Sequence, residues 1–149
     1  LLLFATATAL LTIAAAKAKA SQTSFAYQQW ISKPSDELLT MGIQYENGGQ
    51  FMDSAMVCFT IIADRYTSQS PKAEKELVVR ALNEMGVLST NFYNNYTAAY
   101  QHLILAYDIC KEIGMEEMES YILLNLGNLY NIYEFLFPSK DQTPQARKY

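Results

Sequence analysis

The chain contains a pattern of residues that returns at a constant offset of 44 positions. The matched positions are Leu38, Met41, Gly42, Ala55, Phe59 and Ile62 in the first copy and Leu82, Met85, Gly86, Ala99, Leu103 and Ala106 in the second. A partial third copy consists of Leu123, Leu126, Gly127 and Tyr130. Repetition at a period of roughly 35–45 residues is typical of helical arrays, in which each unit buries its apolar face on the next. Since such arrays usually present a surface to a partner, the pattern favours binding over catalysis.

Apolar residues at helical spacing predict five helices, at about 36–47, 51–66, 71–90, 96–113 and 115–135. We expect Ser35 and Ser70 to act as N-caps, with Pro71 at the first helical position. Gly114 is expected to end the fourth helix in the left-handed conformation. A further helix is predicted to begin at Thr143-Pro144. No stretch shows sustained alternation of apolar and polar residues, so the predicted fold class is all-α.

The first 20 residues have the pattern of a secretory signal peptide. An apolar stretch over residues 1–16 is followed by Ala18-Lys19-Ala20, a small-x-small cleavage site, and then by polar residues. The stretch is short for a membrane span, which needs about 20 residues. We therefore predict export to the periplasm or another extracytoplasmic space, with an uncleaved signal anchor and an ordinary helix as the alternatives. Because the first residue is not Met, the chain is interpreted as a piece of a longer reading frame.

Residues 21–34 are predicted to be a linker, or a short helix whose Trp30 covers the open end of the array. The two cysteines, Cys58 and Cys110, fall among apolar neighbours in different predicted helices. We interpret them as buried free thiols. Export leaves a disulfide between them as the alternative.

The repeated positions resemble those of the tetratricopeptide repeat family, exported bacterial type. The family places a bulky residue, Leu and Gly on a first helix and small, large and small residues on a second. The resemblance covers residues 35–149 and implies a helical-hairpin solenoid with repeats at about 35–70 and 71–114 and a truncated third at 115–149. The glycines at 42, 86 and 127 would let the first helix approach the second closely. Large side chains such as Leu103 would then fill the gap to the following repeat.

The resemblance also implies a concave groove, lined by residues of each first helix that face away from the second. These peptide-binding candidates are Asp36, Leu39, Ile43, Glu46 and Asn47 in the first repeat, Arg80, Asn83, Val87, Thr90 and Asn91 in the second, and Tyr121, Leu124, Asn128 and Asn131 in the third. Family members that hold a C-terminal carboxylate use two or more basic groove residues. Because Arg80 is the sole basic candidate here, we do not expect an acidic C-terminal tail as the ligand.

The charge of the chain argues against nucleic-acid partners. Its net charge is -4, and without the two lysines of the signal peptide it carries 9 basic against 15 acidic residues. An acidic surface repels phosphate groups, and no local Lys/Arg cluster compensates for it. The expected partner is a protein or peptide. Membrane contact is expected solely through the signal peptide or a span outside this sequence.

No motif for catalysis, a metal or a cofactor stands out. The single histidine, His102, has no Cys, Asp or Glu at helical spacing and is interpreted as a surface residue. The cluster Glu116, Glu117 and Glu119 is explained by the positive end of a helix dipole. No phosphate-binding loop or nucleophile elbow is present in the sequence. We therefore expect no enzymatic activity and no cofactor.

The sequence thus predicts an exported scaffold of helical repeats that binds a protein or peptide. A second hypothesis is the extracytoplasmic sensor region of a membrane-bound histidine kinase or transcriptional regulator, because exported repeats of this kind resemble the N-terminal parts of Bacteroidetes-type signalling proteins. A third is a substrate-recruiting portion of an enzyme whose catalytic domain lies beyond residue 149.

Overall fold

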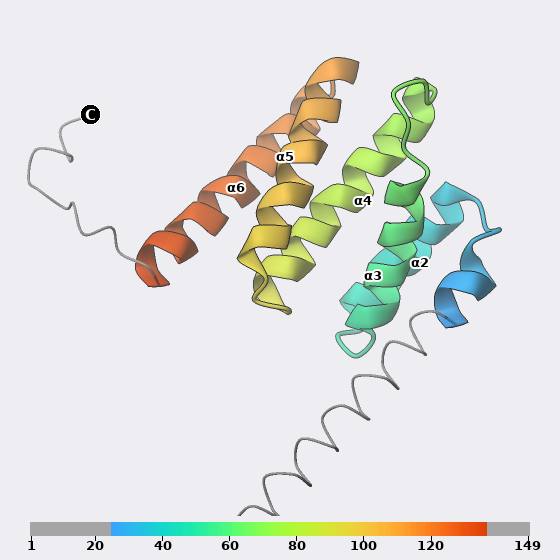
Figure 1. Cartoon of the computed structure of the whole chain (residues 1–149), viewed down its shortest axis with the longest axis horizontal. Coiled ribbons are helices and arrows are strands. Elements are labelled where there is room, and N and C mark those ends of the chain that lie inside the picture. The colour runs from blue at the N-terminus through green and yellow to red at the C-terminus, as the bar shows by residue number, and fades with distance from the viewer. Residues whose placement is uncertain (1–24, 137–149) are drawn as a thin grey trace, which may run out of the picture. The chain divides into compact units, whose positions relative to one another are not determined.

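The computed structural model describes residues 25–136, and every regular element in this range is helical (Figure 1). The labelled helices are α2 (Ser35–Asn47), α3 (Met52–Asp64), α4 (Lys72–Asn91), α5 (Tyr96–Ile113) and α6 (Glu116–Leu136). No strand occurs between residues 25 and 136, which confirms the all-α prediction. The predicted signal peptide and the helix expected at Thr143 lie outside the described residues.

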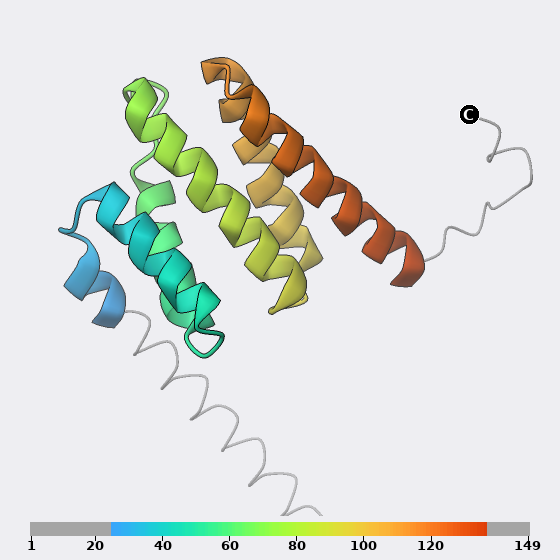
Figure 2. The ribbon, with the colours of Figure 1, turned by 180° about the vertical axis from the view of Figure 1, so that it is seen from behind.

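The chain divides into two compact units between Thr67 and Ser68. This division lies close to the boundary predicted between the first and second repeats. Unit 1 contains the α2–α3 hairpin, and unit 2 contains α4, α5 and α6. Within unit 2, α5 packs on both α4 and α6, and α4 also contacts α6 (Figure 2). The hairpins predicted from the repeat pattern are therefore present within each unit.

The predicted helix ends are correct to within two residues, but both predicted serine caps are wrong. Pro34 and Pro71 themselves occupy the N-cap positions of α2 and α4, with φ of -57° at each. Proline suits the start of a helix because its φ is already close to the helical value and its missing N–H has no intrahelical partner there. Ser35 is instead the first helical residue of α2 and is buried. Gly114 ends α5 with φ 72°, as predicted.

Each hairpin closes where a large side chain of the second helix lies over a glycine of the first. A Cβ atom added at Gly42 would lie 2.4 Å from Cε1 of Phe59, and one added at Gly86 would lie 2.5 Å from Cγ of Leu103. At either distance, a side chain at the glycine would force Phe59 or Leu103 to shift. Phe59 is 0% exposed and Leu103 is 1% exposed. Leu103, which was expected to fill the gap to the following repeat, thus packs on the glycine of its own hairpin.

A short helical stretch over residues 25–30 precedes α2, in agreement with the second of the two predictions for this region. The ring of Trp30 stacks on that of Tyr45 with a centroid distance of 5.8 Å. The hydroxyl of Tyr27 donates a hydrogen bond to Oδ2 of Asp64 at 2.8 Å. These contacts connect the stretch to both helices of unit 1.

Arg65, just after α3, forms hydrogen bonds with the turn between residues 25–30 and α2. Its Nη1 donates to Oγ of Ser35 at 2.7 Å, and its Nη2 donates to the carbonyl oxygens of Ile31 at 2.8 Å and Lys33 at 2.7 Å. Three acceptors around one planar guanidinium fit the fixed fork geometry of arginine. The buried hydroxyl of Ser35 thus contributes to this cluster.

Unit 2 has a comparable polar tie between α4 and α5. Lys75 is buried, and its Nζ donates to the carbonyl oxygen of Ser68 at 2.8 Å and to Oε1 of Glu112 at 2.7 Å. A buried ammonium group is tolerated when it is paired and hydrogen-bonded in this way. At the other end of α5, Oδ1 of Asn95 accepts from the backbone N–H of Ala98 at 3.1 Å and caps the helix.

Both cysteines are free and buried, as predicted. Burial raises the pKa of the Cys58 thiol to about 11. Burial also raises the pKa of Cys110, whose Sγ donates to the carbonyl oxygen of Met115 at 3.1 Å. Because the thiolate is the reactive form, both side chains behave as apolar packing residues at neutral pH.

The close contact at each glycine predicts that alanine is destabilising there. Gly42→Ala and Gly86→Ala each gain up to about 1 kcal/mol of helix propensity. The overpacking against Phe59 or Leu103 costs about 1–3 kcal/mol. We expect a net loss of about 1 kcal/mol in the free energy of unfolding, measured by urea denaturation. Thr40→Ala, on the exposed face of α2, is the matched control; equal stability of the control and the glycine variants would contradict this packing.

The Arg65 cluster predicts that lysine cannot replace this arginine. A lysine ammonium cannot reach all three acceptors in one plane, so Arg65→Lys should lower the free energy of unfolding by about 1–3 kcal/mol. Arg80→Lys, at an exposed position of α4, should change it by less than about 0.5 kcal/mol. Urea denaturation followed by circular dichroism compares the two variants. The assignment fails if Arg65→Lys is as stable as the parent chain.

Candidate functional site

The structure places the predicted groove residues of unit 1 in different environments. Leu39 is buried, whereas Ile43 is 41% exposed and Asn47 is exposed. Asp36 is also exposed, and Glu46 is half-buried. On α2, therefore, Ile43 and Asn47 are one turn apart and accessible from the surface.

The candidates of unit 2 lie on α4 and α6. Those that are exposed are Arg80, Asn91, Tyr121, Leu124, Asn128 and Asn131. Val87 is half-buried. Asn83 and Thr90 are buried, and Oγ1 of Thr90 donates to the carbonyl oxygen of Gly86 at 2.9 Å. The buried pair thus serves the packing of the unit.

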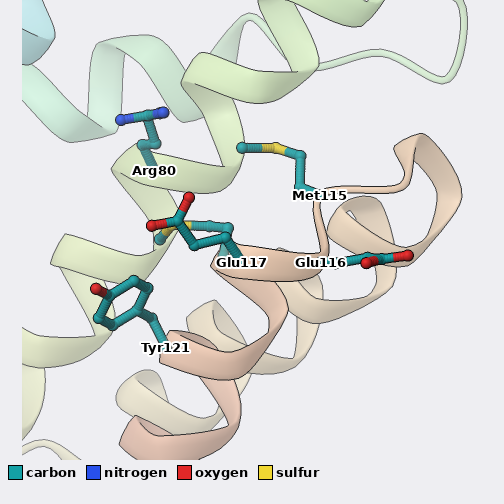
Figure 3. A pocket seen from close by; sticks show the side chains of 6 residues that line it. Arg80, Met115, Glu116, Glu117 and Tyr121 are labelled. Atoms are coloured by element: carbon teal, nitrogen blue, oxygen red, sulfur yellow. The ribbon is translucent and has the colours of Figure 1, made fainter.

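Two of the predicted groove residues, Arg80 and Tyr121, line one cavity. It has a volume of about 310 Å³ and lies between α4 and the start of α6 (Figure 3). Its lining residues are Arg80, Met115, Glu116, Glu117, Met118 and Tyr121. The sequence pattern pointed to the first and last of these, but the methionines and glutamates were not predicted to belong to a site.

An amide pair fixes the two helices in the register that this cavity needs. Nδ2 of Asn125 on α6 donates to Oδ1 of Asn83 on α4 at 2.9 Å. Asn83 lies three residues after Arg80, and Asn125 lies four residues after Tyr121. Residues three or four apart share a helix face, so the amide pair positions the cavity residues one turn away. Asn83 was predicted to touch a ligand, whereas its observed partner is an intramolecular amide.

The cavity combines one cation with carboxylates, a phenol and thioethers. Glu117 and Tyr121 extend from the same face of α6 toward the side of α4 that carries Arg80, whereas Glu116 points away (Figure 3). Within residues 25–136, no ion pair within 4.0 Å is formed by Arg80. Its guanidinium can therefore donate hydrogen bonds to a carboxylate or carbonyl oxygen of a ligand. Glu117 can receive a cationic or amide donor beside it.

A second, larger cavity lies between α5 and α6, with a volume of about 560 Å³. Its lining residues are Tyr96, Thr97, Tyr100 and Ile104 from α5 and Leu126, Leu129, Tyr130 and Tyr133 from α6. None of these eight lining residues, all of them within the described range, is charged. None of these residues was among the predicted groove residues, because the cavity depends on how α5 and α6 pair.

The described residues give no sign of a catalytic or metal centre. No group of three or more His, Cys, Asp or Glu residues suited to a metal ion occurs within residues 25–136.

Burial raises the pKa of the Glu84 carboxyl group, whose Oε1 accepts a hydrogen bond from Nδ2 of Asn83 at 3.2 Å. Among the helices between residues 25 and 136, none is long and apolar enough to cross a membrane.

His102 is less exposed than the surface position predicted for it. The ring is half-buried on α5, and its Nδ1 lies 3.5 Å from Oγ of Ser89 on α4. Burial lowers the pKa of His102 below its usual 6.5, because the charged form of the ring is disfavoured in the folded chain. Its role is thus to pack between the two helices of the second hairpin.

Comparison with protein-family models, with curated proteins and with solved structures gave no match to this chain. The tetratricopeptide resemblance and any function therefore depend on the residues and geometry described above.

The depressed pKa of His102 predicts a pH-dependent stability. As the pH falls below 6.5, the unfolded chain binds a proton at His102 more readily than the folded chain does, so stability falls as the pH decreases through this value. His102→Gln should reduce this decline between pH 7.5 and 5.5, measured as the urea midpoint at each pH. Gln101→Asn, at the exposed neighbouring position, is the control. An unchanged decline in His102→Gln would show that the histidine is not its source.

Proposed function

We propose that this chain is an exported scaffold of tetratricopeptide-type helical repeats that binds a segment of a partner protein. The observation that carries the proposal is the meeting of Arg80 and Tyr121 in one surface cavity. Both were expected to touch a ligand from their positions on the first helices of consecutive repeats. Arginine and tyrosine are also the residue types that dominate binding energy at protein interfaces.

The composition of the cavity favours a peptide over a small polar metabolite. Arg80 and Glu117 supply opposite charges, so both a carbonyl oxygen and a donor group of a ligand find a partner. Met115 and Met118 offer flexible apolar surface that adapts to different side chains. A segment with a basic residue beside an apolar one would satisfy both parts.

The overall charge supports the same class of ligand. Residues 25–136 contain six Lys or Arg residues against 14 Asp or Glu residues. This excess attracts basic segments and speeds their association. The export part of the proposal is supported by the signal-peptide pattern of residues 1–20, which lie outside the described range.

The proposal predicts that peptides selected for binding will depend on the cavity. We expect an array of synthetic 12-residue peptides to yield binders that contain Lys or Arg next to an apolar residue. Arg80→Ala and Tyr121→Ala should each weaken the best binder by about tenfold or more, as expected for an interface residue worth about 1.4 kcal/mol. Fluorescence anisotropy with the labelled peptide measures the dissociation constant.

Lys72→Ala is the matched control, because this exposed residue of α4 lies two turns before Arg80 and outside the cavity. It should leave the dissociation constant within about twofold. Circular dichroism verifies that each variant is folded. The proposed function is rejected if the array yields no binder, or if the binders are unaffected by both cavity variants.

A further inference from the structure

The sequence Asn95-Tyr96-Thr97 matches the acceptor motif for N-linked glycans, and the proposed function does not use it. The motif is an asparagine followed by any residue except proline and then by serine or threonine. Of the eight asparagines in the chain, Asn95 alone stands in this pattern. A motif this short also occurs by chance, so its place in the fold decides whether it can act.

The motif lies at the surface, where the turn between α4 and α5 leads into α5 (Figure 1). Residues 92–95 form this turn, and Asn94 has a φ of 51°, in the left-handed region that tight turns use. The backbone N–H of Asn95 donates to the carbonyl oxygen of Ser89 at 2.8 Å, which fixes the turn against the end of α4. Both Asn95 and Thr97 are exposed. An enzyme can therefore reach both side chains without opening the hairpin.

The two polar atoms of the Asn95 side chain have separate roles. Oδ1 accepts a hydrogen bond from the backbone N–H of Ala98 at 3.1 Å and so caps α5. Nδ2 donates to no residue between 25 and 136. An N-linked glycan is attached through the amide nitrogen, and the amide oxygen remains an acceptor in the product. Attachment of a glycan is thus compatible with the cap.

We propose that Asn95 is the acceptor of an N-linked glycan. The donor is an oligosaccharide carried on a lipid pyrophosphate. In the transfer, Nδ2 forms a bond to the anomeric carbon of the first sugar and loses one proton. The bond between that carbon and the pyrophosphate oxygen breaks, and the lipid pyrophosphate leaves with the bonding electrons. Because N-linked glycans are found on secreted proteins, this proposal rests on the export part of the proposed function.

The position of Asn95 leaves the cavity at Arg80 open. Helix α5 has 18 residues and is therefore about 27 Å long. Asn95 directly precedes α5, whereas Met115, which lines the cavity, follows the last residue of the helix by two positions. The glycan is attached at one end of α5, and the peptide is bound at the other. Modification of Asn95 therefore does not compete with the proposed peptide binding.

Transfer of a glycan to the folded, complete 149-residue chain tests the proposal. The purified chain is incubated with a single-subunit oligosaccharyltransferase that recognises Asn-x-Thr and with its lipid-linked oligosaccharide. Intact mass and peptide mapping identify the product. We expect one glycan per chain, on the peptide that contains Asn95. A synthetic peptide of residues 91–100 verifies that the enzyme is active, and an unmodified chain beside a modified peptide would overturn the proposal.

Matched variants locate the modified atom. Asn95→Asp keeps a capping oxygen but lacks the amide nitrogen, and Thr97→Val lacks the hydroxyl of the motif. Both variants should lose the glycan. Asn91→Gln, at an exposed asparagine outside the motif, should be modified to the same yield as the parent chain. A glycan that persists in Asn95→Asp or in Thr97→Val would refute the assignment.

Thermal unfolding followed by circular dichroism tests whether the cap survives. The glycosylated chain and Asn95→Asp should melt no lower than the unmodified chain, whereas Asn95→Ala, which removes the capping oxygen, should melt lower. A glycosylated chain that melts as low as Asn95→Ala would contradict the separate roles of Oδ1 and Nδ2. The assay supplies the enzyme and the donor, and the variants leave Arg80 and Tyr121 intact. Failure here is therefore separable from failure of export or of peptide binding.

Discussion

The contact between a glycine on one helix and a large side chain on the next is the constraint on which both hairpins depend. At Gly42 and Gly86 the missing side chain makes room for Phe59 and Leu103, respectively. The large side chains are fully enclosed, and burial of this kind is worth about 1.5–3 kcal/mol each. The same contact sets how closely the helices approach and therefore which of their residues remain at the surface.

The helices could be predicted from the sequence because their signals are local. Apolar spacing, the glycines at 48–49 and Gly114 located the elements to within two residues. The start of a helix is decided by finer differences. Both Pro34 and Pro71 provide φ and ψ values suited to an N-cap, and in each case the proline took the place that the adjacent serine was expected to fill.

The polar ties between helices could not be predicted, because each joins residues that are far apart in the sequence. Arg65 reaches Ser35 across 30 positions, and Asn125 reaches Asn83 across 42. Neither residue belongs to a motif. Arg80 and Tyr121 were expected to be accessible from their repeat positions, but their sharing of a cavity follows from the amide pair one turn away. A prediction based only on repeat positions therefore assigns Asn83 to the groove. In the structure, the side-chain oxygen of Asn83 instead accepts a hydrogen bond from Asn125.

Helix α6 contributes to both cavities of unit 2 because it exposes two different faces. Tyr121 and Tyr130 are nine residues apart, which is about two and a half helical turns, and so they lie on opposite sides of the helix. One side carries Tyr121 beside the charged residues Arg80 and Glu117, whereas the other carries Tyr130 and Tyr133 in an uncharged groove. The charged side suits a ligand that binds and dissociates, because the polar groups of such a ligand have partners both in the cavity and in water. Exposure of the uncharged side to water costs more free energy, because its surface is apolar. This side is therefore better suited to an element that stays bound to it.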